Sequence, residues 1–280
     1  MLGPKIEALP DDYPSKARCL ENLSWLFHSV GNWVECKRLI THTLKLWRGW
    51  EGDQRVTQTL SFLSAANQQM NFPEEGVQQA EKALEIFERR GDPANQARCL
   101  IYLAYVFRDD KRLGAAEDAA SHAIDLLPRK GEQFLVCQGH HILGDIYRSK
   151  GVTEKAIHHY EVALEIASNF DWHIPLFWTH FSLAQLFFED GRLNDAQTHI
   201  ERAKSHTVNN PYNSARASLL QARLWYGQHT FEEVKTEALR ALGVFEKLGA
   251  TEDAEETRKF LGRMDPVLVT PMNWLTMVSS

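Results

Sequence analysis

The sequence lacks long apolar runs, an excess of positive charge and a rich complement of cysteines. Its 280 residues are 44% apolar and 24% charged, and the formal net charge is −6. No stretch reaches the roughly 18 apolar residues that a membrane helix needs, and a negative chain offers no broad attraction to phosphate backbones or anionic bilayers. We therefore expect a soluble protein that binds neither nucleic acid nor membranes.

The four cysteines lie far apart and form no CxxC pair: Cys19, Cys36, Cys99 and Cys137. This spacing is typical neither of a disulfide framework nor of a zinc ribbon. The first ten residues contain no basic segment followed by an apolar run, so we expect no secretory signal there. Together these features predict a reducing, cytoplasmic location.

Recognisable catalytic motifs are also missing, including GxxxxGK(S/T), HExxH, GxSxG and a glycine-rich dinucleotide loop. We therefore predict a protein that is not an enzyme and that uses no cofactor or bound metal. The alternative is a shielded site built from His141, Asp145 and Arg148, which share one flank of a helix at spacings of four and three. No nucleophile accompanies them, so a surface network is the favoured interpretation.

What the sequence does contain is an internal repeat of forty residues. It is carried by a leucine register, by two registers of small residues and by a turn register: Leu23, Leu63, Leu103, Leu143 and Leu183; Cys36, Gly76, Ala116, Ala156 and Ala196; Thr43, Ala83, Ala123, Ala163 and Ala203; Gly31, Asn71, Lys111, Gly151 and Gly191. Four registers in phase predict one structural unit per forty residues.

Each unit reads as a pair of helices. Apolar residues recur at spacings of three and four, as in Ile142, Leu143, Ile146 and Tyr147, which is helical periodicity. Neither helix of a pair can bury its apolar stripe alone, so neighbouring hairpins must stack into a continuous core. The sequence therefore predicts an all-α fold, an α-solenoid of helical hairpins.

One unit resembles the tetratricopeptide repeat family at its motif positions, which hold His140, Leu143, Gly144, Tyr147, Gly151, Ala156, Tyr160 and Ala163. The resemblance covers about residues 14 to 262 and implies a right-handed superhelix of about six hairpins. Their period is forty rather than the commoner thirty-four. The sixth unit is expected to shorten to a spacing of thirty-eight, and residues 251–263 to form a capping helix.

The domain boundaries follow from this repeat. We expect an extension at 1-13, a solenoid at 14-262 and an apolar tail at 264-280. The solenoid units lie near 14-53, 54-93, 94-131, 132-172, 173-206 and 212-250, followed by the cap at 251-263.

The paired histidines within one unit raise the question of a metal site. Adjacent helical residues point about 100° apart, so His140 is predicted to face the second helix of its unit and His141 the other flank. His158 and His159 diverge in the same way. Four ligands in this arrangement do not converge on one ion, and no metal is expected.

In tetratricopeptide arrays the concave face is lined by residues of the first helices, and the resemblance selects positions here. These are rich in arginine and aromatic residues, which suit peptide recognition. The predicted groove consists of Trp25, Arg98, Tyr105, Arg108, His141, Asp145, Arg148, Trp178, Phe181, Gln185, Phe188 and Arg223. Two interpretations of Trp178, Phe181 and Phe188 remain open: exposure in the groove, or packing against the next hairpin.

The chain also resembles the forty-residue arrays at the C-terminal end of fungal NACHT or NB-ARC type signalling ATPases, particularly at residues 238–250. Our first hypothesis is a non-enzymatic scaffold that binds a protein or peptide in its concave groove. The resemblance implies an alternative, a ligand-sensing or autoinhibitory module of a signalling ATPase whose nucleotide-binding part is missing from this sequence.

Overall fold

The computed structural model describes residues 15–29, 32–46, 74–127, 131–207, 210–227 and 231–264, together with Ile6, Ala8 and Pro10. Over these residues the regular secondary structure is helical and includes no β-strand, which confirms the all-α prediction. None of the described helices is both long enough and apolar enough to cross a membrane. The expected first helix of the second unit lies outside the described residues.

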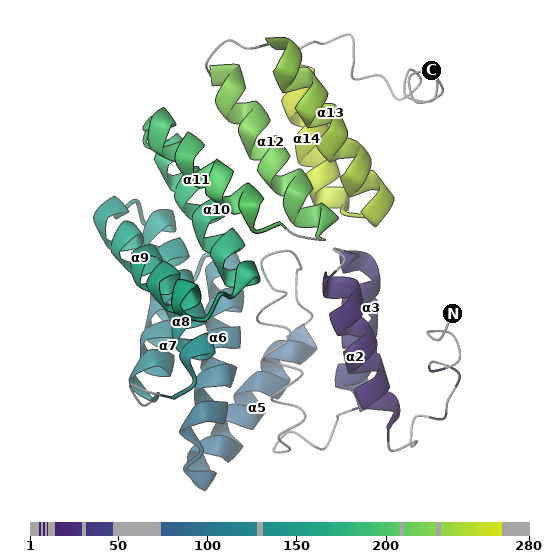
Figure 1. Cartoon of the computed structure of the whole chain (residues 1–280). Helices are drawn as coiled ribbons and strands as arrows, with labels where there is room; N and C mark the ends of the chain where they lie inside the picture. The colour runs from purple at the N-terminus through teal and green to yellow at the C-terminus, as the bar shows by residue number, and fades with distance from the viewer. Residues whose placement is uncertain are drawn as a thin grey trace.

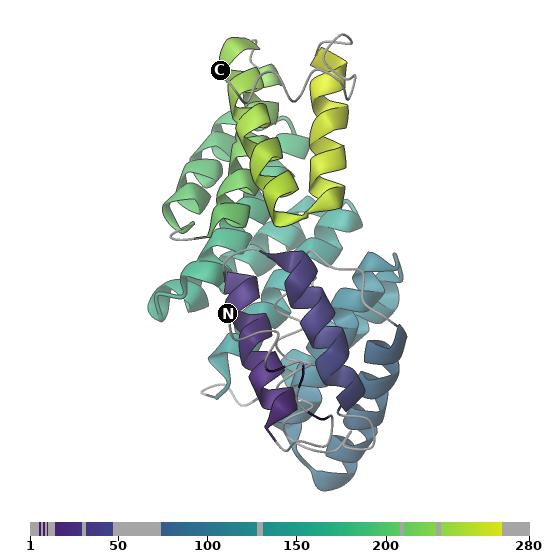
Figure 2. The same ribbon diagram turned by 90° about the vertical axis from the view of Figure 1, so that its right-hand side faces the viewer.

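From residue 74 to residue 264 the described helices pack in chain order as antiparallel neighbours, and residues 16–46 form a further antiparallel pair (Figure 1; Figure 2). The bounds are α2 (Lys16–Ser29), α3 (Trp33–Leu46), α5 (Glu74–Arg90), α6 (Pro93–Asp109), α7 (Leu113–Asp125), α8 (Gln133–Ser149), α9 (Thr153–Asn169), α10 (His173–Glu189), α11 (Leu193–Ser205), α12 (Pro211–Gly227), α13 (Phe231–Leu248) and α14 (Thr251–Met264). This arrangement confirms a solenoid of helical hairpins.

The first helices of successive hairpins form one layer. Helix α6 packs on α8, α8 on α10, and α10 on α12, in addition to the contacts within each hairpin. Contacts between successive second helices are less extensive over the described part of the chain. The first helices therefore line the inner side of the stack, where side chains from different hairpins can meet.

The repeat period is visible in the helix starts. Helices α6, α8 and α10 begin at Pro93, Gln133 and His173, forty residues apart, and α12 begins at Pro211, thirty-eight residues later. Each of these four helices contains 17 residues. The forty-residue period and its late shortening are thus confirmed.

The turns inside the α6–α7, α8–α9 and α10–α11 hairpins share one geometry. Lys111, Gly151 and Gly191 adopt left-handed backbone angles with φ of 61°, 71° and 72°. In each turn the N–H of the next residue donates to a carbonyl five residues earlier, over 2.8 to 2.9 Å. This bond closes the end of the first helix. Glycine adopts this conformation readily, whereas Lys111 does so against its side chain's steric preference.

Small residues allow the two helices of a hairpin to approach closely. Ala156 and Ala196 are completely buried between them. A Cβ atom added to Gly144 would overlap the ring of Tyr160, which is itself fully buried. The glycine and the tyrosine are therefore a matched pair across the hairpin.

Candidate functional site

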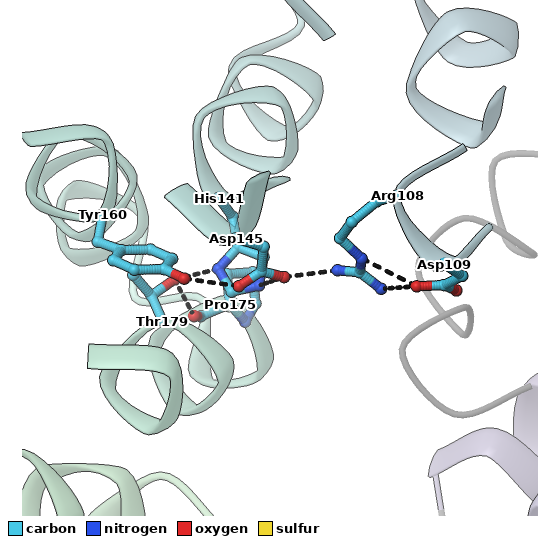
Figure 3. A network of polar contacts seen from close by, with 7 residues as sticks. All are labelled: Arg108, Asp109, His141, Asp145, Tyr160, Pro175 and Thr179. Carbon is cyan, nitrogen blue, oxygen red and sulfur yellow. Dashed lines mark hydrogen bonds and ion pairs between the residues drawn. The ribbon is translucent and has the colours of Figure 1, made fainter. Parts of the chain in front are cut away.

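A buried polar network centred on Asp145 ties three helices together (Figure 3). Arg108 Nη1, from the end of α6, donates to Asp145 Oδ2 over 2.6 Å. The Tyr160 hydroxyl, from α9, donates to Asp145 Oδ1 over 2.7 Å. Arg108 also donates to Asp109 Oδ1 through Nε at 2.9 Å and Nη2 at 2.7 Å. Both carboxylates thus balance this one guanidinium.

The protonation states follow from these contacts. Burial alone would raise the pKa of Asp145, but His141, Arg108 and Arg148 and the Tyr160 hydrogen bond outweigh it and lower the pKa to about 2. Burial alone would lower the pKa of Arg108, yet Asp145 and Asp109 raise it above its ordinary value. Asp145 and Arg108 are therefore both charged at neutral pH.

His141 is buried beside this network and faces α10. Its Nδ1 lies 3.2 Å from Thr179 Oγ1, and that hydroxyl donates to the Pro175 carbonyl over 2.8 Å. Because the Thr179 hydroxyl donates its proton to the Pro175 carbonyl, its oxygen is left to accept, and the Nδ1–H of His141 donates to it. Burial lowers the pKa of His141, partly opposed by Asp145, and so favours the neutral ring. His141 thus lies on a different flank of α8 from His140, as predicted, although its ring also lies 5.8 Å from that of Tyr160 in α9.

Histidine pairs join the two helices of a hairpin at equivalent places in two successive units. The Nδ1 atoms of His140 and His159 lie 3.0 Å apart, and those of His180 and His199 lie 3.1 Å apart. This confirms that His140 faces the second helix of its unit. Across the described residues, no group of three or more metal-ligating side chains is arranged to hold an ion. The repeated pairs act as packing contacts between helices.

A pocket of about 220 Å³ opens beside Asp145 on the inner layer, with walls from α6, α8, α10 and α12. Its cationic lining consists of Arg108, Lys111, Arg148 and Arg216, and its acidic lining of Asp109 and Asp145. Because four successive hairpins contribute, the pocket exists only in the stacked array and not in any single repeat.

The aromatic wall of the pocket is largely buried. Trp178 is 8% exposed and Phe181 is 3% exposed, and their rings meet edge to face at 5.9 Å. The Arg216 guanidinium of the next hairpin lies over the Phe181 ring, 5.1 Å from its centroid. Phe181 therefore packs toward the following hairpin, and little surface of either aromatic residue is left for a ligand.

The pocket brings together half of the predicted groove residues: Arg108, Asp145, Arg148, Trp178, Phe181 and Gln185. Four other predicted residues do not line the pocket. Tyr105 and His141 are buried, while Arg98 pairs with Glu132 at 3.0 Å and Arg223 with Glu256 at 2.8 Å.

Two predicted residues remain. Phe188 is partly buried against the core and is not part of the pocket lining. The side chain of Trp25 lies outside the described residues.

Sequence reasoning missed several lining residues, among them Asp109, Lys111 and Ser182. Asp109 follows Arg108 directly and resembles an ordinary solvent-exposed helix end. Lys111 carried a usable signal, because it occupies the turn register at which the next two units have glycine. Ser182 offered none.

Comparisons with known proteins identify the type of fold. No protein-family model matches the chain, and no curated protein matches it. Among solved structures, it is similar to a Rap protein complexed with competence and sporulation factor. That match has 12% identity and a TM-score of 0.65, and it covers 95% of this chain and 79% of that one.

Two further structures are similar. A signal transduction ATPase with numerous domains and a tetratricopeptide repeat sensor, from Pyrococcus horikoshii, has 16% identity and a TM-score of 0.59, covering 94% of this chain and 45% of that one. Aspartyl phosphate phosphatase F from Bacillus subtilis has 12% identity and a TM-score of 0.54, with 94% and 78% covered. At these identities the likeness establishes a tetratricopeptide-type helical repeat fold.

Proposed function

We propose that the chain is a non-enzymatic, cytoplasmic interaction scaffold that binds a peptide or an extended protein segment along its inner layer of helices. The observation that carries the proposal is the shared pocket, to which four successive first helices contribute. A segment lying across these helices would contact every hairpin at once, which is the recognition mode that stacked repeats permit.

The polar network supports binding rather than catalysis. Arg108 holds both Asp145 and Asp109, Tyr160 donates to Asp145, and His141 is held by Thr179. A general acid or base needs a pKa near the working pH, whereas Asp145 has a pKa of about 2. The network therefore serves to fix the shape and charge of the pocket.

The similar solved structures add support. The Rap structure was solved in complex with competence and sporulation factor, so a fold of this type is able to hold such a factor. By analogy we place the ligand of this chain on the inner layer.

The direct test is selection of linear peptides from a random library on the immobilised chain, followed by affinity measurements. A variant with Arg148→Gln and Gln185→Ala should bind selected peptides at least about tenfold more weakly, since each change removes a polar contact in the pocket. The matched control carries Arg240→Gln and Gln78→Ala at exposed positions on α13 and α5. Alanine at Trp178 or Phe181 is unsuitable, because truncating a buried aromatic costs about 3 to 5 kcal/mol.

The proposal requires that selection yields binders, that the control retains them and that the pocket variant loses them with unchanged helical content. An empty selection, or equal binding by both variants, would refute it.

A second candidate is a ligand-sensing or autoinhibitory module of a signalling ATPase related to the NACHT or NB-ARC type. It is favoured by the likeness to the ATPase with a tetratricopeptide sensor, of which this chain spans 45%. In that case a bound peptide should change the curvature of the stack. Small-angle scattering with and without a selected peptide would then show a change in the radius of gyration, and identical curves would exclude this role.

A further inference from the structure

We propose that the pocket among α6, α8, α10 and α12 recognises a carboxylate of the bound segment, an inference that rests on the proposed function. The lining of the pocket carries an excess of positive charge. Four cationic side chains line the pocket against the two carboxylates of Asp109 and Asp145. Four positive charges against two negative ones leave the lining with a net charge of +2, and both carboxylates are already engaged by Arg108.

The three other cations of the lining, Arg148, Arg216 and Lys111, use few of their N–H donors within the described part of the protein. Arg148 donates through Nη1 alone to Glu189, over 3.0 Å, and the Glu189 side chain is 55% exposed. Arg216 donates through Nη1 to Asp253, over 2.7 Å, away from the pocket. Lys111 makes no ion pair with any described residue. Most of the N–H donors of these three groups thus remain available to an incoming acceptor.

The guanidinium of Arg148 also has a donor without an acceptor. The Nε atom of Arg148 is buried and has no hydrogen-bond partner among the described residues. A buried donor without an acceptor carries a desolvation cost, and donating a charge-assisted hydrogen bond to an incoming carboxylate would remove it. The guanidinium can present Nε and Nη2 side by side, which is the geometry that grips a carboxylate with two bonds.

The same surroundings disfavour a doubly charged phosphate. Asp109 and Asp145 are fixed in the lining, and like charges at short range in a partly buried site repel strongly. A carboxylate carries a single charge and is small enough for a pocket of about 220 Å³. It can come from an acidic side chain or from the C-terminus of the bound segment, and the experiment has to separate these two sources.

The first experiment uses small probes and does not depend on finding a peptide. The 15Nε–1Hε resonance of Arg148, assigned by its loss in Arg148→Gln, is followed during titration with N-acetylglycine, N-acetylglycinamide and inorganic phosphate. We expect a saturable shift with the carboxylate, at least about fivefold larger than with the amide at equal concentration. The Arg240→Gln protein, altered on α13, should respond like the original protein.

An equal response to carboxylate and amide, or no response to the carboxylate, would overturn the proposal. A response to phosphate that exceeds the carboxylate response would overturn the choice of carboxylate.

The second experiment uses peptides selected for binding to the chain. Each is compared with one variant in which internal Glu and Asp are replaced by Gln and Asn, and another in which the C-terminal carboxylate is an amide. Roughly tenfold weaker binding by one variant identifies the source of the carboxylate, and that loss should vanish in Arg148→Gln protein. If peptides bind but neither neutral variant weakens, the carboxylate inference fails while the proposed function stands. If no peptide binds, the proposed function fails, and the small-probe titration still decides the pocket's chemistry.

Discussion

Two neighbouring hairpins, α8 with α9 and α10 with α11, share a backbone plan and differ in what they bury. Both place a histidine pair between their helices at the same register, His140 with His159 and His180 with His199. Both have turn glycines with φ near 70°. Their common features are thus those that set helix spacing and turn geometry.

The difference lies at the centre of each hairpin. The α8 and α9 pair buries Asp145 under the Tyr160 hydroxyl, whereas the equivalent positions forty residues later hold Gln185 and Ile200. Gln185 is partly exposed in the pocket and Ile200 is fully buried. The repeat therefore tolerates either a charged or an uncharged centre, and of these two hairpins only α8 with α9 supplies a buried carboxylate to the pocket.

The largest expected effect comes from removing that charge. Asp145→Asn leaves Arg108, whose side chain is 13% exposed, with only Asp109 as a counter-charge. Breaking a buried ion pair on one side should lower the free energy of unfolding by about 3 kcal/mol. Gln185→Asn, the matched change in the neighbouring hairpin, should cost less than about 1 kcal/mol. Urea unfolding at pH 7 measures both, and equal losses would show that the two centres are energetically alike.

The next effect tests the pairing of Gly144 with Tyr160. Gly144→Ala should destabilise the fold by about 1 to 2 kcal/mol through overlap with the tyrosine ring, although alanine is the better helix former. The equivalent residue in the other hairpin is already Ala184, opposite Ile200. In a double-mutant cycle, Gly144→Ala should therefore cost less once Tyr160→Ile is present. A fully additive cycle would contradict the proposed matching.

The histidine pairs should make stability depend on acid. Burial, reinforced by neighbouring imidazoles, lowers the pKa of His140 from 6.5 to about 4 and of His180 to about 3. Burial and Arg202 lower the pKa of His199 to about 4. The unfolded chain then binds more protons below pH 6.5, so folded stability is lost as the pH falls toward these values.

Leucine at both His180 and His199 should reduce the pH dependence of the melting temperature between pH 6.5 and 4, leaving the part that comes from His140. Asp145 provides a separate window, because its pKa is lowered from 3.8 to about 2, and its contribution is lost only below pH 3.8. A pH profile unchanged from that of the original protein would mean that His180 and His199 do not cause the acid sensitivity.

The smallest effect concerns the outer contacts of the first helices. Tyr147 donates its hydroxyl to Glu117 Oε1 over 2.6 Å, while the equivalent residue in the next hairpin is Phe187. Tyr147→Phe should therefore cost only about 0.5 kcal/mol, the net value of one partly exposed hydrogen bond. Tyr226→Phe, at a residue that is 44% exposed, serves as the control and should change thermal stability by less.

The fold was largely predictable because the same pattern of small, apolar and turn residues recurs in successive units of the sequence. Small residues at Ala116, Ala156 and Ala196 are all completely buried, as their shared register requires. The site was predictable only in part. Arg108, Asp145 and Arg148 were found because the resemblance to tetratricopeptide arrays selects these positions of the first helices, whereas Asp109 and Lys111 belong to the pocket through the last residue of α6 and the turn that follows it.

Periodicity by itself determined that this protein is an all-α stack of forty-residue hairpins, because helix spacing and turns depend on local residues that recur. Only the tertiary structure decided that Arg98 is engaged by Glu132 of the next hairpin and Arg223 by Glu256 of α14. It also decided that Trp178 and Phe181 are buried and that the Nε of Arg148 stays unsatisfied among the described residues. The physical reason is that ion pairing and burial depend on residues brought together across hairpins, about forty positions apart in the chain.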